Sequence, residues 1–344
     1  MSTKHTRPSA GLLISEAIVA FLILGAGIFF FCHSPAPQQP PEKDLVLSEQ
    51  TATPTVESPT GTPAEKPTDP PAETPTKDPD IVQPSPDETA SFKAISVTME
   101  QLLDGSAETL AAASGANAIV VDMKPDSGRL NWVSQEPVAK NVGANSTVPE
   151  INRLLSEFLT KTDLYTVARM SAFRDDLVGY DWGCTVKGTN GARWTDDSGN
   201  HWSSLGNNVV RAYNARCAAE LAELGFDEIL LENVSSPFRG DLAAIPLDER
   251  FNDRAQTKFL TELKTTVEPT SAILSVHVDE ATLADTAALP TSLTAELTGS
   301  TFDRVWLTED AVDSLAFAGI TAERVVTVVS TFSPASGNLC AVAP

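Results

Sequence analysis

The chain has 344 residues, enough for one large domain with additional segments. Its 46 acidic and 24 basic side chains give a formal charge of −22 at neutral pH. This balance argues against a nucleic-acid partner, because phosphate binding needs a basic surface. It suits a soluble, self-repelling, exported protein.

The first residues predict a membrane segment. An apolar stretch of roughly 20 residues, long enough to cross a bilayer as a helix, runs from Gly11 to Phe31. Because Lys4 and Arg7 precede it, we expect residues 1–10 in the cytoplasm, an uncleaved transmembrane anchor over 11–32 and everything after it outside the cell. The expected location is the bacterial cell membrane, with a single pass and an extracellular C-terminal domain. A cleaved secretory signal is the competing interpretation.

The same stretch also resembles a type IV prepilin leader. Such leaders have a short basic segment, a Gly before the cleavage site and a Glu five residues after it. Gly11 and Glu16 occupy these positions, whereas Leu12 stands where a Phe is usual. A carboxylate in an apolar helix is costly and often functional, although one near the interface reaches water. A pilin-like surface subunit therefore remains an alternative.

Residues 33–90 predict a disordered stalk. Pro, Thr, Glu and Ser dominate this segment, and 14 of the 24 prolines lie between Pro35 and Pro86. Such a composition cannot bury enough apolar surface to offset the entropy of ordering it. We expect an extended linker that holds the following domain away from the membrane.

Residues 91–344 have the size and pattern of one (β/α)8 TIM-like barrel. Apolar runs that predict strands alternate with helical runs that predict covering helices. An eighth strand, Leu339–Val342, is weakly marked, so the C-terminal end of the barrel is expected to be incomplete or irregular. The other predicted strands are Phe92–Val97, Ala118–Met123, Leu164–Met170, Phe226–Leu231, Ala272–Val278, Phe302–Leu307 and Arg324–Ser330. The predicted helices are Ser106–Ser114, Pro149–Thr160, Asn207–Leu224, Glu249–Thr266, Ala281–Leu289 and Asp310–Ala318.

The cysteines and histidines indicate neither a metal site nor a cofactor. The four cysteines match no zinc spacing, and the two histidines of the predicted barrel form no His-rich motif. Cys184 and Cys217 could pair in an oxidising compartment, a question that the sequence leaves open.

Acidic side chains follow two of the predicted strands and carry the main functional hypothesis. A barrel presents reactive groups where strands pass into loops, and Asp122 and Glu232 occupy such positions. Glycoside hydrolysis needs two carboxyl groups beside one bond, one to donate a proton and one to attack or to activate water. Arg169 is expected to keep a neighbouring carboxylate ionised or to form a structural ion pair. Asp175 is a fourth catalytic candidate.

Further side chains are candidates for substrate binding. Trp132, Trp194 and Trp202, together with Trp182, lie in loops after the second and third strands, where flat rings suit stacking against sugars. Some of them are expected instead to pack the long loop onto the barrel. The remaining candidates are Lys124, His277 and Glu309.

Several stretches resemble the glycoside hydrolase-like domain family of exported bacterial proteins, a group related to α-amylase-type barrels. The resemblance covers about Phe92 to Asp241 and implies a (β/α) barrel with a carbohydrate-directed role. The matching stretches are Asn117–Lys124 with Asp126 and Gly128, Tyr165–Arg169, Phe173–Asp175, Trp194 with Asp196, Trp202, Tyr213–Asn214, and Glu220 leading to Gly225–Ile229.

The chain also departs from this family pattern, as a divergent member would. After the fourth strand the family has Asp-Tyr-Val-Arg-Phe-Pro, whereas this chain has the segment from Glu232 to Pro237, without an Arg. A later Tyr-Pro-Ser-His motif is replaced by Trp306 to Glu309. The leading hypothesis is a membrane-anchored glycoside hydrolase acting on a cell-envelope or extracellular polysaccharide. A degenerate barrel that binds glycan without cutting it is the alternative.

Overall fold

The computed structural model describes residues 91–278, 293–308, 320–332 and 339–342. The predicted anchor, the predicted stalk and the helices predicted at Ala281–Leu289 and Asp310–Ala318 lie outside these residues. No helix within the described ranges has the length and hydropathy to span a bilayer.

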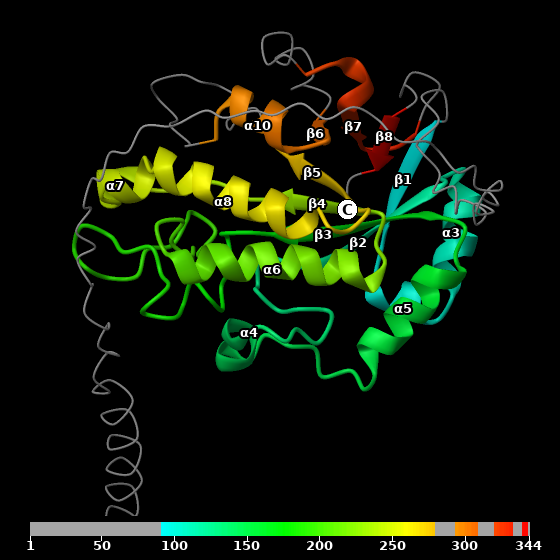
Figure 1. Cartoon of the computed structure of the whole chain (residues 1–344), viewed down its shortest axis with the longest axis horizontal. Coiled ribbons are helices and arrows are strands. Elements are labelled where there is room, and N and C mark those ends of the chain that lie inside the picture. The colour runs from blue at the N-terminus through cyan, green and yellow to red at the C-terminus, as the bar shows by residue number, and fades with distance from the viewer. Residues whose placement is uncertain (1–90, 279–292, 309–319, 333–338, 343–344) are drawn as a thin grey trace, which may run out of the picture. The chain divides into compact units, whose positions relative to one another are not determined.

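Eight parallel strands close into a barrel in the order β1 to β8 (Figure 1). Closure is made by β1 and β8, which pair from Phe92 with Leu339 to Ala94 with Ala341. The expectation of an incomplete C-terminal end was therefore wrong, because the short last strand pairs on both sides. The strands are β1 (Phe92–Val97), β2 (Ala118–Lys124), β3 (Tyr165–Ser171), β4 (Glu228–Glu232), β5 (Ile273–His277), β6 (Arg304–Thr308), β7 (Val325–Val329) and β8 (Leu339–Val342).

Helices cover the outside of the barrel. Those near the predicted positions are α3 (Ser106–Ser114), α5 (Ile151–Lys161), α6 (Asn208–Leu224) and α8 (Asp253–Val267). The described helices that were not predicted are short: α2 (Met99–Leu103), α4 (Pro137–Val142), α7 (Leu247–Arg250), α10 (Ala295–Thr301) and the 3₁₀ turns η1 (Leu242–Ala244) and η3 (Ala322–Arg324). Helices α6 and α8 lie side by side against the strands (Figure 1).

Helix α6 shows how local sequence sets these elements. The Asn207 side chain accepts hydrogen bonds from the backbone N–H groups of Val209 and Val210 and so caps the first turn. Gly225, with φ at 113°, ends the helix in the left-handed conformation that glycine adopts at low cost. Between these caps, Val210, Tyr213, Cys217 and Leu221 are buried at helical spacing and form one apolar stripe on the helix.

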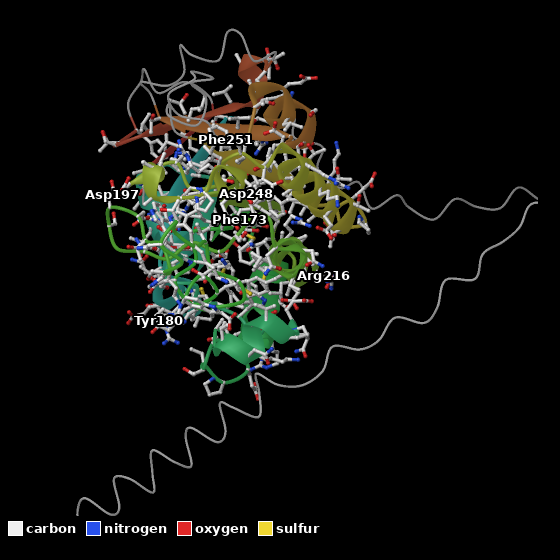
Figure 2. The ribbon with its side chains drawn as sticks, turned by 90° about the vertical axis from the view of Figure 1, so that its left-hand side faces the viewer. Phe173, Tyr180, Asp197, Arg216, Asp248 and Phe251 are labelled. Carbon is white, nitrogen blue, oxygen red and sulfur yellow. The ribbon has the colours of Figure 1, made fainter. Side chains whose placement is uncertain are left out.

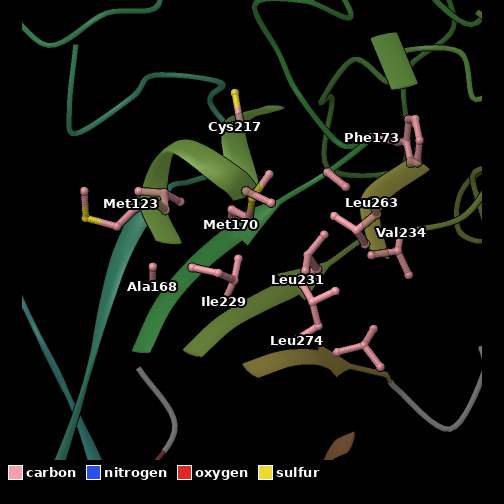
Figure 3. Packing of buried hydrophobic residues seen from close by; sticks show 14 of the residues in the cluster. Met123, Ala168, Met170, Phe173, Cys217, Ile229, Leu231, Val234, Leu263 and Leu274 are labelled. Carbon is pink, nitrogen blue, oxygen red and sulfur yellow. The ribbon is translucent and has the colours of Figure 1, made fainter. Parts of the chain in front are cut away.

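The core has an outer layer, between strands and helices, and an inner layer inside the barrel. Phe173 lies within the molecule, whereas Tyr180 projects at its outer edge (Figure 2). In the outer layer, side chains of β2, β3 and β4 pack against Cys217 of α6 and Leu263 of α8 (Figure 3). The inner layer is a smaller apolar cluster that consists of Phe92, Ala94, Ala118, Val120, Val167, Leu230, Trp306, Val326 and Ala341.

Candidate active site

Four successive strands place one polar side chain each at the carboxyl end of the barrel. Asp122 on β2 lies in register with Arg169 on β3. Glu232 ends β4 and His277 ends β5. Because side chains alternate along a strand, Asp122, Arg169 and Glu232 share the inward face with Val120, Val167 and Leu230 of the inner core. The alternation of a barrel strand therefore brings these groups together above the inner core.

Arg169 joins the two carboxylates. Its Nη1 atom lies 2.9 Å from Oδ1 of Asp122, and its Nη2 atom contacts Oε2 of Glu232. The other Glu232 oxygen, Oε1, lies 2.8 Å from Nδ1 of His277. Because one guanidinium group contacts both carboxylates, they are less than about 8 Å apart, within the range of paired glycosidase carboxyls.

The two carboxyl groups have pKa values that shift in opposite directions. Burial opposes ionisation of Glu232, but the His277 hydrogen bond and the Arg169 charge outweigh it and lower the pKa of Glu232 to about 2. Burial raises the pKa of Asp122, with help from the charges of Glu232 and Asp126 and against that of Arg169. Such a divergence widens the pH range in which one acid is protonated while its neighbour is ionised.

A pocket of about 200 Å³ opens beside these strand-end side chains. It takes in Arg169, Glu232 and His277 but is not lined by Asp122, whose side chain is 45% exposed. The other lining residues come from the loops after β2, β3 and β4 and from the end of β5: Asp126, Arg174, Asn233, Val234, Ser235, Phe238, Arg239 and Val278.

A polar network ties together the loops after β2, β3 and β4. Arg174 contacts Asp126 at 2.6 Å and Asp196 at 2.7 Å. Asn233 donates from Nδ2 to Oδ1 of Asp126 (3.2 Å) and to the Ser171 hydroxyl (2.9 Å). Its backbone has a φ of 50°, a left-handed conformation that Asn tolerates better than most residues. The conformation turns the chain sharply just after Glu232.

Lys124 and Asp175, predicted to bind substrate and to act in catalysis, form a structural ion pair instead. Both side chains are almost completely buried, and Nζ lies 2.7 Å from Oδ2. Nζ also donates to the carbonyl of Ser171, while Oδ1 of Asp175 accepts from the backbone of Val178. Neither residue lines the pocket, so the pair fixes the start of the loop after β3.

The three tryptophans predicted to stack on substrate are also buried. Trp132 donates from Nε1 to Glu220 (2.9 Å), Trp202 to Asp196 (3.1 Å) and Trp194 to the carbonyl of Asp241 (3.0 Å). A buried ring offers no face to a sugar. The structure therefore replaces the stacking prediction with the packing role for all three, whereas Trp182 is exposed.

The other predictions have mixed outcomes. Glu309 lies outside the described residues, whereas His277 lines the pocket. Cys184 and Cys217 are free thiols. Among the residues that the structure describes, no group of three or more His, Cys, Asp or Glu side chains is placed to hold a metal ion.

The predictions missed the pocket roles of Arg174, Asn233, Phe238 and Arg239. Arg174 belonged to the family-like stretch Phe173–Asp175, which was a usable signal. The other three follow the fourth strand, in the segment where the chain departs from the family motif. Their convergence on the pocket depends on how this loop folds back over the barrel.

The sequence from residue 92 to residue 291 matches the family described as "Putative glycosyl hydrolase domain". The chain belongs to this family. More than half of the 344 residues fall within the match, which includes Asp122, Arg169, Glu232 and His277. No curated protein matches this member of the glycosyl hydrolase domain family.

The chain is also similar, at low identity, to several solved structures. A hypothetical protein from Ruminiclostridium thermocellum ATCC 27405 is 23% identical, over 53% of this chain and 96% of that chain, with a TM-score of 0.44. The PgaB (BpsB) glycoside hydrolase domain from Bordetella bronchiseptica is 12% identical, over 70% and 84%, with a TM-score of 0.45. The spore cortex-lytic enzyme SleL from Bacillus megaterium QM B1551 is 14% identical, over 75% and 56%, with a TM-score of 0.42.

Proposed function

We propose that this protein hydrolyses glycosidic bonds in a cell-envelope or extracellular polysaccharide, with Asp122 and Glu232 as the reacting carboxyl groups. The observation that carries the proposal is their arrangement around one guanidinium group, with one pKa raised and the other lowered to about 2. Glycoside hydrolysis needs this combination of one protonated and one ionised carboxyl. The family match supports the same reaction class.

In the proposed reaction, the Asp122 carboxyl gives its proton to the glycosidic oxygen as the bond to the anomeric carbon breaks. The ionised Glu232 attacks that carbon, or activates the water that does. If Glu232 attacks, water then breaks the glycosyl–Glu232 bond, giving its hydroxyl to the anomeric carbon and its proton to Asp122. If Glu232 activates water, that water gives its hydroxyl to the anomeric carbon and its proton to Glu232, and proton exchange with solvent restores both carboxyl groups. Arg169 and His277 hold Glu232 ionised and oriented, which limits its conformational freedom before the reaction.

The proposal includes a place of action. We infer that residues 11–32 anchor the protein in a bacterial membrane and that residues 33–90 carry the barrel outside the cell. The apolar stretch after Lys4 and Arg7 and the Pro-rich composition of the linker support this inference. A polysaccharide of the envelope would then be within reach of the barrel.

The proposal is tested by incubating the full-length protein with a panel of envelope polysaccharides and following new reducing ends. The rate should be highest in acid, because Glu232 must be ionised, above about pH 2, and Asp122 must be protonated, below its raised pKa. In Asp122→Asn we expect the rate to fall by at least about 100-fold. The high-pH limb of the pH–rate profile should also disappear, because the group that must be protonated is gone. An unchanged rate and limb in this variant would remove Asp122 from the mechanism.

One observation favours a second candidate, glycan binding without hydrolysis. Arg169 and His277 already occupy both oxygens of Glu232, which weakens the carboxylate as a nucleophile. In this case no polysaccharide of the panel would be cut, but one would bind the wild-type protein. Replacing Arg239, which lines the pocket, by Ala should weaken that binding.

A further inference from the structure

A patch on the long loop between β3 and α6 has a composition unlike the rest of this acidic chain. It consists of Tyr180, Trp182, Lys187 and Arg193. The aromatic side chains are 58% and 50% exposed, although both belong to residue types that usually bury their rings. Figure 2 shows Tyr180 at the outer edge of the molecule. We call this set the cationic-aromatic patch.

The two cations of the patch are held directly opposite each other. Lys187 and Arg193 form an antiparallel bridge pair in a hairpin, a position in which like charges destabilise each other. Neither forms an ion pair with another described residue. Three acids near the patch have other partners. Asp181 accepts from the backbone N–H of Gly183 at 2.8 Å, Asp176 contacts His201 at 2.6 Å, and Glu249 accepts from the Ser204 hydroxyl at 2.8 Å.

Aromatic rings hold these cations in place. The Arg193 guanidinium lies 4.4 Å from the centre of the Tyr180 ring and 4.8 Å from that of Trp182. Its Nε also donates to the Tyr180 carbonyl at 2.7 Å. Nζ of Lys187 lies 5.0 Å from the centre of Trp182. A guanidinium fixed in this way loses little freedom when its terminal nitrogens bind an anion.

The hairpin beneath the patch is rigid and joined to the pocket. Val186 and Trp194, neighbours of the two cations in sequence, point to the opposite side and are buried. Trp194 donates to the carbonyl of Asp241, which follows the pocket-lining residues Phe238 and Arg239. Because the hairpin follows β3, it belongs to the same carboxyl-end face of the barrel as Glu232.

We propose that the cationic-aromatic patch is a docking site for a polysaccharide whose sugars carry carboxylate groups, bound by Lys187 and Arg193. This inference rests on the proposed function, since it names the class of glycan that would also reach the pocket. The chain as a whole repels anions, but charges beyond roughly 8 Å are largely screened at physiological ionic strength. Local contact with two fixed cations therefore decides binding. The planar guanidinium group matches a carboxylate in geometry.

The test compares polygalacturonate with the same polymer after its carboxylates have been reduced to alcohols, using the full-length protein in detergent micelles and affinity electrophoresis. We expect the wild type to bind the carboxylate polymer at least about tenfold more tightly. The double variant Lys187→Gln/Arg193→Gln should lose about tenfold in affinity, and Trp182→Ala a smaller factor of about three. A matched control, Lys140→Gln/Lys258→Gln, removes the same charge elsewhere and should bind as the wild type does.

Three results would overturn the docking site. These are equal affinity of the wild type for the two polymers, unchanged affinity in Lys187→Gln/Arg193→Gln, or tighter binding of a glycerol-phosphate polymer than of polygalacturonate. Hydrolysis is scored separately, from new reducing ends on the panel of envelope polysaccharides. Patch-dependent binding without hydrolysis would reject the proposed function alone, whereas hydrolysis with patch-independent binding would reject the docking site alone.

Discussion

The interior of the barrel contains two Glu–Arg pairs, one near each end, and both glutamates come from β4. Near the amino ends of the strands, Glu228 accepts from Arg304 at 2.8 Å, Trp306 at 2.9 Å and Tyr165 at 3.1 Å. Its side chain is completely buried. Four residues later on the same inward face, Glu232 contacts Arg169 and His277 but opens onto the pocket, with 18% of its side chain exposed.

The difference between the two pairs indicates why we interpret one as structural and propose a catalytic role for the other. The Glu228 carboxylate is enclosed by three donors, and the Arg304 guanidinium lies 5.0 Å from the ring centre of Phe92 and 5.4 Å from that of Tyr165. This pair can only hold strands together. The Glu232 pair has the same chemistry but borders space for a ligand and a second acid, Asp122, with a raised pKa. Surroundings, and not residue type, separate the two roles.

The largest expected difference between the pairs is in catalysis. Replacing Glu232 by Gln removes the ionised carboxylate and should lower kcat by at least about 1000-fold. This loss corresponds to an increase of about 4 kcal/mol in the activation free energy. The fold should remain, since Arg169 keeps Asp122 as a partner. Steady-state kinetics on a cleaved polysaccharide measure this. Comparable kcat values in Glu232→Gln and wild type would contradict the assignment.

The matching change at the other pair should act on stability. Glu228→Gln leaves Arg304 with a buried charge and no ionised partner, so we expect a loss of about 3–5 kcal/mol in unfolding free energy. The kcat per folded molecule should stay the same. Urea unfolding measures the loss, and the double variant Glu228→Leu/Arg304→Met should recover a part of it. A lower kcat in folded Glu228→Gln would contradict the assignment of a purely structural role to the Glu228–Arg304 pair.

Stability in acid should distinguish Glu232 as well. Its pKa is about 2 in the folded protein and near 4.5 when unfolded, so its contribution is complete above pH 4.5 and disappears as the pH falls towards 2. The shift corresponds to about 3 kcal/mol. Unfolding free energies measured from pH 5 to pH 2 should therefore fall more steeply for wild type than for Glu232→Gln. Parallel curves would show that Glu232 is not stabilised as an anion.

The smallest expected effect concerns His277. His277→Ala removes the hydrogen bond to Oε1 of Glu232, so the pKa of Glu232 should rise by about one unit. The acid limb of kcat/KM should move to higher pH by the same amount, with little change in KM. His201→Ala is the control, because His201 contacts Asp176 on the distant loop surface and should leave the limb in place.

Strands and their strand-end groups were predictable from the sequence because a parallel barrel imposes simple rules. Each buried strand is a short apolar run, and the residue at its carboxyl end faces the site. These rules predicted Asp122, Arg169 and Glu232 as neighbours, and the structure brings them together through Arg169. They also predicted His277, which contacts Glu232. Their catalytic and binding roles remain predictions.

Loop side chains were not predictable in the same way. Trp132 stands in the loop after β2 and Trp202 in the loop after β3, yet the indoles of both are completely buried. Lys124 and Asp175 are charged, yet their pairing at 2.7 Å allows both to be buried. Burial in these cases depends on contacts between segments far apart in the chain. No local pattern carries that information.

Closure of the barrel has a mechanical consequence if the protein is tethered as proposed. Strand β1 starts at Phe92 and is paired with β2 on one side and β8 on the other, all parallel. A pull on residue 91 along this strand loads both ladders in shear, so their hydrogen bonds must give way together and not one after another. Resistance to such a pull is set by the rate of forced unfolding and not by equilibrium stability. A barrel closed in this way would resist being unravelled from its first strand while it holds the proposed polysaccharide.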